Sequence, residues 1–159
     1  LLTGLRPGEL LGLRWADIKG GTVYISRAVN ILGEETQGKN QNAIRAFALS
    51  ERARAVLDEQ REATGAGESV FELVSEAYYY KRWQVYCKAN GIPPISVYEL
   101  RHSFVSVIKS LPAGEVKGLV GHSQSMDTFG VYSHALSGDA AATADDVNAA
   151  FDRVLGREI

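Results

Sequence analysis

The sequence reads YELRHSF at residues 98–104, GHS at 121–123 and VYSH at 131–134. This stretch places an arginine on a predicted helix, a histidine in a turn and a tyrosine on a further helix. A guanidinium presents a planar fork to phosphate oxygens, a histidine can donate a hydrogen bond to the same group, and a tyrosine can act as an oxygen nucleophile. The stretch therefore suits chemistry on a phosphodiester, and we expect the rest of the chain to support it.

The N-terminal part of the chain predicts a helix followed by a β-hairpin. Residues 3–14 favour a helix with Pro7 near its start, where a missing N–H is tolerated. Residues 22–29 alternate apolar and polar side chains, as a half-buried strand does. A polar stretch over 33–42 separates this strand from a second one at 43–49. We expect the two strands to pair as an antiparallel hairpin with a long tip.

Helices dominate the remainder of the chain. Serine N-caps, a capping box and glycine or proline stops delimit them. The expected helices cover residues 50–64, 75–90, 97–111 and 115–120, a short segment after Ser125, and a tail from Thr143 to Gly156. In the helix over 75–90, four residues at helical spacing are expected to face the core: Tyr79, Trp83, Tyr86 and Cys87. The predicted fold class is α+β, mainly α-helical with a small antiparallel sheet near the N-terminus.

The composition is that of one globular domain. The chain has 159 residues, of which 45% are hydrophobic and 23% charged, and this suffices for a single core. No signal peptide is visible in it, and no apolar run approaches the roughly 18 residues that a membrane span requires. One cysteine, Cys87, excludes an internal disulfide and fits a reducing cytoplasm. The single methionine is Met126 and the chain opens within a motif, so we expect a fragment of a longer protein.

The net charge of −2 argues against a generic nucleic-acid binder, which carries a strongly basic balance. The distribution softens this argument. Residues 135–159 contain two of the 17 basic residues and five of the 19 acidic ones, so the rest of the chain is nearly neutral. Affinity for DNA therefore requires a local basic face or help from a further domain.

The motifs occur in a recognisable order. L-R-H-S-F at 100–104, G-H-S at 121–123 and V-Y-S-H at 131–134 follow T-G-L-R-P-G-E-L-L-G-L-R-W-A-D-I at 3–18. Together they resemble the first arginine box and the C-terminal boxes of the tyrosine recombinases, the phage-integrase family. A single R-H or G-H pair would carry no information, whereas four ordered boxes are a strong signal.

The resemblance implies a role for each box. Arg6, Arg101 and His122 would stabilise charge on the scissile phosphate. Tyr132 would attack that phosphate and form a 3′-phosphotyrosyl link. The bond energy is kept in this link, so no nucleotide cofactor is expected. No metal is expected either, because the sequence has no cluster of metal ligands.

Three further residues belong to the predicted site. Lys39 precedes Arg45 by six residues, a spacing that resembles the family's hairpin lysine, the general acid for the leaving 5′ oxygen. By itself, a lysine in a polar loop is a solvated charge. Glu9 lies three residues after Arg6, so it can reach back along one helical turn and hold it. Tyr98 stands where the family usually has a histidine, and its phenol is a poor acid at neutral pH.

The resemblance also implies partners and domain limits. Double-stranded DNA is the expected partner, bound by a homotetramer with an upstream DNA-clamping domain. Residues 1–135 would form the catalytic core and 136–159 a tail helix. The apolar face of that helix would dock on its own domain or on a neighbouring subunit.

Two other functions fit the same residues. A type IB topoisomerase shares the chemistry but rejoins the same strand, and the motif spacing and the tail favour a recombinase over it. A degenerate DNA-binding module without catalysis is allowed by Tyr98 and by the acidic charge.

Overall fold

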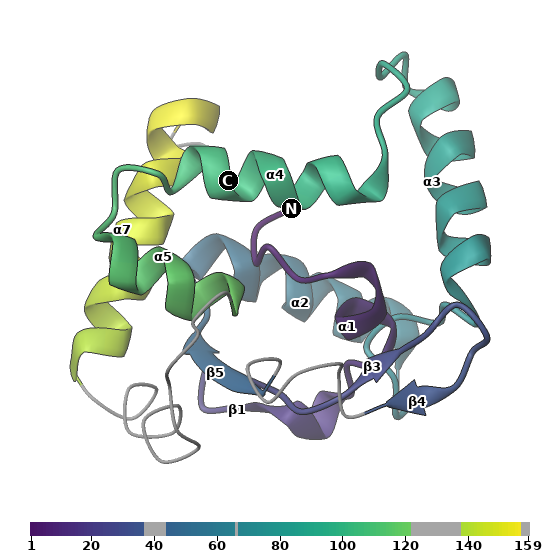
Figure 1. The fold of residues 1–159 in the computed structure, drawn as a ribbon, viewed down its shortest axis with the longest axis horizontal. Helices are drawn as coiled ribbons and strands as arrows, with labels where there is room; N and C mark the ends of the chain where they lie inside the picture. Colours follow the sequence, from purple (N-terminus) through teal and green to yellow (C-terminus); the bar gives the residue numbers. More distant parts are fainter. Residues whose placement is uncertain (37–43, 66, 122–137, 157–159) are drawn as a thin grey trace.

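The computed structural model describes residues 1–36, 44–65, 67–121 and 138–156 (Figure 1). The helices are α1 (Pro7–Leu11), α2 (Glu51–Thr64), α3 (Glu76–Ala89), α4 (Val97–Val107), α5 (Ala113–Val120) and α7 (Gly138–Leu155), with a 3-10 turn, η1 (Trp15–Asp17). The strands are β1 (Ile18–Lys19), β2 (Thr22–Ile25), β3 (Ala28–Val29), β4 (Glu35–Thr36) and β5 (Arg45–Ala48). This confirms the predicted α+β class, with helices dominant and small antiparallel sheets.

The main sheet has three antiparallel strands in the order β1-β2-β5. The predicted pairing of the strands on either side of the polar stretch is confirmed, because Val23 of β2 lies opposite Phe47 of β5. Side chains alternate along both strands, and the buried face of β2 carries Val23 and Ile25. On β5 the buried face carries Phe47 and also a charged residue, Arg45. The sheet thus contributes one charge to the interior.

The predicted single strand over residues 22–29 is wrong, because the chain leaves the main sheet after Ile25. Ala28 and Val29 form β3, which pairs with β4 in a separate two-stranded sheet. The Asn30 side-chain oxygen accepts hydrogen bonds from the backbone N–H groups of Leu32 and Glu34, both at 2.9 Å. This Asx-type turn closes a short hairpin inside what the sequence predicted to be a long polar tip.

The predicted helix over residues 3–14 shortens to the five residues of α1. Arg6 has φ −68° and ψ 151°, an extended conformation. A residue before proline is disfavoured from the helical region, so the helix begins at Pro7. The serine caps behave as the sequence predicts, since Ser50, Ser75 and Ser96 each accept a hydrogen bond from the backbone N–H three residues on.

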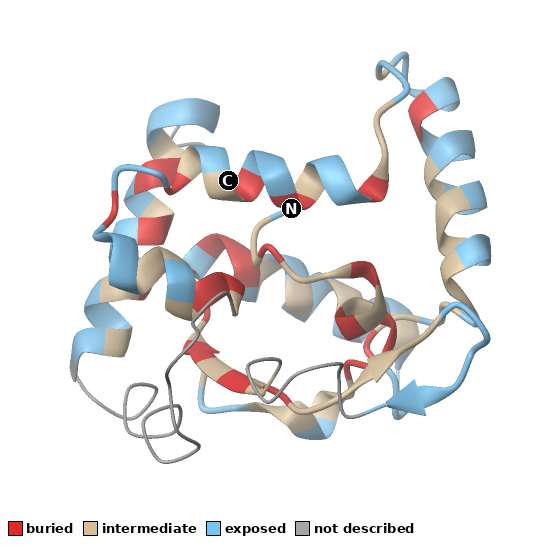
Figure 2. Ribbon diagram, in the orientation of Figure 1, coloured by how far each residue is buried: buried red, intermediate tan, exposed pale blue. Residues whose placement is uncertain are grey.

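The core lies between the main sheet and helices α4, α5 and α7 (Figures 1 and 2). Phe104 of α4 and Phe151 of α7 meet with ring centroids 6.1 Å apart. Helix α7 packs against β5, α2 and α4. Of the predicted apolar face, Val147 and Phe151 are buried in this domain, whereas Val154 and Leu155 are exposed, so docking on a neighbouring subunit stays a prediction.

Helix α7 begins at Gly138 and not at the predicted Thr143. The Thr143 hydroxyl donates to Glu115 of α5 at 3.2 Å, so it bonds across to a neighbouring helix instead of capping its own. The stop at Gly156 is confirmed, since Gly156 has φ +83° and its N–H donates to the Asp152 carbonyl at 3.0 Å. A glycine at this position adopts the left-handed conformation without strain.

Helix α3 stands at the edge of the domain (Figure 2). Its buried residue is Cys87, and it packs mainly against α1. Tyr86 is 53% exposed, so its predicted place in the core is wrong. Trp83 is partly buried and its indole N–H donates to the Ile95 carbonyl at 2.8 Å, which ties α3 to the start of α4. Helical spacing alone did not show that the rest of the domain covers only a narrow face of this helix.

Candidate functional site

Helix α1 presents Arg6 at its N-terminal end. The Arg6 backbone N–H donates to Glu9 Oε2 at 2.9 Å, and Arg6 Nη1 donates to Glu9 Oε1 at 2.8 Å. The carboxylate of Glu9 therefore caps the helix and orients the guanidinium at the same time. This is the contact that the spacing of three residues predicts.

Helix α4 contributes Arg101. Its side chain is buried, with 6% of the residue exposed. Nη1 donates to the Gly4 carbonyl at 2.5 Å and Nη2 to the Val120 carbonyl at 2.6 Å. Gly4 has φ +60°, and a Cβ there would collide with the Phe104 ring. Glycine thus allows the segment before Arg6 to approach α4 closely enough for Arg101 to bind it.

Strand β5 contributes Arg45, which the sequence analysis used only as a spacing landmark. Arg45 is 5% exposed. Its Nη1 and Nη2 donate to the two carboxylate oxygens of Glu9 at 2.8 and 2.9 Å, and its Nε donates to the Leu119 carbonyl at 2.9 Å. A usable signal existed in the sequence: strand alternation puts Arg45 on the same face as Phe47 and Leu49, and a buried arginine requires an acidic partner.

The C-terminal end of α5 is where the three arginines meet. The carbonyls of Leu119, Val120 and Gly121 accept hydrogen bonds from three different guanidinium groups, those of Arg45, Arg101 and Arg6 respectively. The last carbonyls of a helix lack partners within the helix and carry the negative end of its dipole. The end of α5 therefore gathers cations from α1, β5 and α4. We call Arg6, Arg45, Arg101 and Glu9 the arginine cluster.

Among the described residues, the arginine cluster has more positive than negative charge. Burial alone would raise the pKa of Glu9, but hydrogen bonds and charge from Arg45, and hydrogen bonds from Arg6, lower it to about 2. Burial, together with the charges of Arg6 and Arg45, lowers the pKa of Arg101 to about 10. Three guanidinium groups share one carboxylate here, so an added anion would relieve their repulsion.

Tyr98 lies one helical turn before Arg101 on α4. It is 44% exposed. Burial first, and then the charges of Glu76 and Tyr98, raises the pKa of Tyr80 on α3. The residue that departs from the family pattern is exposed and lies one turn of α4 from Arg101, at the rim of the arginine cluster.

Three predicted site residues, Lys39, His122 and Tyr132, lie outside the described residues. Gly121, which has φ +69° and ends α5, directly precedes His122 in the sequence. Within the part of the chain that is described, no group of three or more His, Cys, Asp or Glu side chains could hold a metal ion. None of the described helices is long and apolar enough to cross a membrane.

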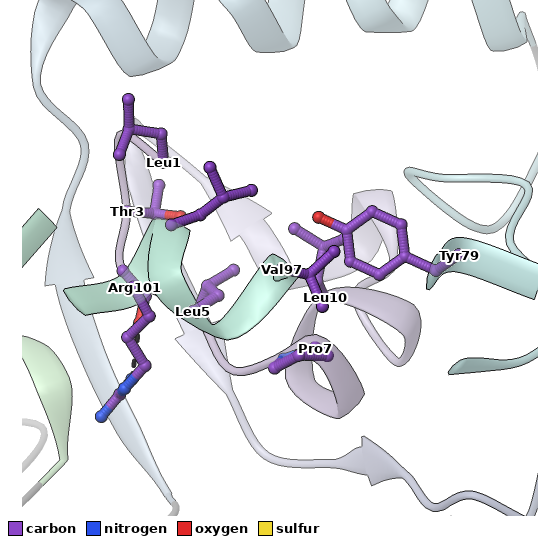
Figure 3. A pocket seen from close by; sticks show the side chains of 10 residues that line it. Leu1, Thr3, Leu5, Pro7, Leu10, Tyr79, Val97 and Arg101 are labelled. Carbon is purple, nitrogen blue, oxygen red and sulfur yellow. Dashed lines mark hydrogen bonds between the residues drawn. The ribbon is translucent and has the colours of Figure 1, made fainter. Parts of the chain in front are cut away.

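A small pocket lies behind Arg101 (Figure 3). Its lining includes Thr3, Leu10, Tyr79 and Val97. The Arg101 side chain passes along one side of it, and its guanidinium end points away from Tyr79. Arg101 therefore lines the pocket with its side chain while its guanidinium takes part in the arginine cluster.

The chain belongs to the phage integrase family, whose pattern matches residues 1–138. It is 25% identical to the ICEBs1 integrase of Bacillus subtilis (strain 168), over 92% of this chain and 46% of that protein. It is also 25% identical to a tyrosine recombinase XerC-like protein of Caldanaerobacter subterraneus subsp. tengcongensis, over 94% of this chain and 47% of that protein. The chain spans about half the length of these relatives.

The fold is similar to that of a solved integrase. The structure of the Tn1549 transposon integrase in complex with transposon right end DNA superimposes with a TM-score of 0.64, over 98% of this chain and 56% of that one. The sequences are 17% identical, so the likeness concerns the fold alone. It supports the α+β architecture that the sequence predicts.

Proposed function

We propose that the chain is the catalytic domain of a site-specific DNA recombinase that integrates or recombines a phage or mobile element. The observation that carries this proposal is the arginine cluster. Arg6 and Arg101, far apart in the sequence, both donate to carbonyls at one helix end, beside Arg45 and the carboxylate of Glu9. Such an excess of planar donors suits the non-bridging oxygens of a phosphodiester.

The proposed reaction begins with attack of the Tyr132 phenol oxygen on a DNA phosphorus. A bond forms between that oxygen and phosphorus, and the bond from phosphorus to the 5′ oxygen breaks. The phenol loses its proton during attack, and Lys39 gives a proton to the leaving 5′ oxygen. Arg6, Arg101 and His122 stabilise the charge on the phosphate. The reverse steps, with a 5′ hydroxyl from another strand, complete the exchange.

The proposed partners follow from the proposed recombinase function. Double-stranded DNA is the substrate, and a homotetramer on two duplexes would place strands for exchange. An upstream clamp would supply the DNA affinity that the nearly neutral charge of this domain lacks. The proposed location is the cytoplasm, where such a protein reaches the chromosome. The relatives named integrase and recombinase, and the neighbour with transposon DNA, support this proposal.

The test is covalent capture on DNA. The intact protein is incubated with nicked duplexes of randomised sequence, and the products are separated on a denaturing gel. We expect a protein–DNA adduct with the wild type and none with Tyr132→Phe, which removes one oxygen and keeps the ring. Tyr86→Phe is the matched control, because Tyr86 is 53% exposed on α3 and also loses only its hydroxyl.

The other outcomes decide between the competing functions. DNA binding without any wild-type adduct would identify a degenerate DNA-binding module. Relaxation of supercoiled plasmid without strand exchange would identify a topoisomerase. An adduct that persists in Tyr132→Phe would mean that another residue is the nucleophile, with Tyr98 the first to examine.

A further inference from the structure

We propose that Arg45 is a positioning residue of the arginine cluster: it occupies Glu9 and thereby leaves Arg6 available to an anion. The inference rests on the proposed function only in taking that anion to be a phosphate of the substrate. Arg45 itself is not expected to touch DNA, since its side chain is 4% exposed.

The geometry divides the carboxylate of Glu9 unequally. Arg45 binds both of its oxygens, at 2.8 and 2.9 Å, in the bidentate manner that suits a guanidinium. Arg6 Nη1 shares one of those oxygens at 2.8 Å. The side chain of Arg6 is 33% exposed, against 2% for Glu9. Arg6 is therefore the member of this trio that can reach solvent, and Arg45 is the member that neutralises Glu9.

Charge balance explains why this matters. Counted over the described residues of the cluster, three guanidiniums and one carboxylate leave an excess of two positive charges when Arg45 is present. Without Arg45, the excess falls to one, and Glu9 would remain buried with Arg6 as its side-chain ion partner. A buried carboxylate that loses one of its two cationic partners interacts more strongly with the cation that remains. Arg6 would then turn toward Glu9 and away from an incoming phosphate.

Arg45 also acts as a mechanical brace. It joins α1 through Glu9 and the end of α5 through the Leu119 carbonyl. If Arg45 only holds α1 and α5 together, every variant that lacks Arg45 should have a loosened cluster, including one that also lacks Glu9. Positioning through Glu9 predicts something different: removing Glu9 as well restores the charge excess to two and frees Arg6 again. The two roles can therefore be separated by a double variant.

The experiment titrates the intact protein with inorganic sulfate and follows the Nε–Hε resonances of Arg6 and Arg101 by NMR. Sulfate needs no DNA sequence, so the measurement is independent of whether the protein forms a covalent adduct. We expect Arg45→Met to weaken sulfate binding about tenfold and to shift the Arg6 resonance, as loss of a charged partner would. Arg45→Lys, which keeps the charge, and Arg45→Met/Glu9→Gln should bind within about threefold of the wild type.

The matched control is Arg52→Met. Arg52 is also buried, at 8% exposure, and its Nε bonds Asp152 at 2.7 Å, in contact with α7 and not with α5. It should lower stability without changing sulfate binding. Sulfate affinity that is unchanged in Arg45→Met overturns the inference. If Arg45→Met fails to fold, the double variant decides: binding more than about tenfold weaker than wild type in a folded double variant overturns the inference equally.

An adduct test that fails while the sulfate results hold would reject the proposed function and keep the role of Arg45. Adduct formation by the wild type, with sulfate binding indifferent to Arg45, would do the reverse. The two proposals thus fail separately.

Discussion

Two buried arginine sites in this domain differ in how their charge is balanced. At the end of α7, Arg52 bonds the carboxylate of Asp152 at 2.7 Å, donates to the Gly156 carbonyl, and has its backbone N–H bound by Asn148 at 3.1 Å. At this site one guanidinium is paired with one carboxylate. At the end of α5, three arginines meet one carboxylate. Both sites join distant segments, yet only the first is complete by itself.

The difference distinguishes a structural ion pair from the phosphate-binding site that we propose. A balanced pair holds α7 against α2 and requires nothing further. An unbalanced cluster carries a cost in the folded protein: burial first, and then the charges of Arg6 and Arg45, lower the pKa of Arg101. An excess of charge of one sign is typical of sites where a ligand supplies the opposite charge. Shifted pKa values are also typical of such sites.

The largest expected effect tests this contrast directly. Arg101→Met should lower adduct formation on nicked DNA by about 100-fold or more, because it removes a fixed donor from the reacting phosphate. Arg52→Met should leave adduct formation per folded molecule unchanged. It should lower the free energy of unfolding by about 2 kcal/mol, since it removes a charged hydrogen bond to Asp152, whose side chain is 26% exposed. Denaturing gels and chemical unfolding measure the two effects. Equal losses of adduct in both variants would contradict the distinction.

The next effect concerns acid stability. The pKa of Glu9 is lowered from 4.5 to about 2, so the folded state binds fewer protons than the unfolded state between these values. Its contribution to stability is therefore present above about pH 4.5 and is lost as the pH falls towards 2. The shift corresponds to about 3 kcal/mol. Unfolding by urea at a series of pH values measures it.

Glu9→Gln is the control for the acid prediction, because it removes the titrating group while keeping its shape. The slope of stability against pH below about 4.5 should be smaller in this variant. An unchanged slope would mean that other carboxylates account for the acid sensitivity and that Glu9 does not anchor the cluster.

The smallest effect is expected at the rim of the cluster. Tyr98→His restores the residue that the family usually has, at a side chain that is 44% exposed. Both side chains can donate a hydrogen bond, so adduct formation should stay the same or rise, by about threefold at most. Gel assays over a range of pH would measure this. A loss of tenfold or more would show that Tyr98 has a role that histidine cannot fill.

Sequence alone determined the features that depend on neighbouring residues. Serine caps located the starts of α2, α3 and α4 because their hydrogen bonds span three residues. The contact between Arg6 and Glu9 followed from spacing on one helical turn. The order of the motifs predicted the family, which the match over residues 1–138 confirms.

Tertiary structure decided what depends on distant partners. It broke the predicted strand after Ile25, left Tyr86 exposed and packed α7 against β5, α2 and α4. It also brought Arg45 to Glu9, a contact that the sequence did not predict. The physical reason is the separation along the sequence between the groups that interact. Capping and periodicity act within a few residues, whereas the neutralisation of a buried charge depends on which segments the whole topology brings together.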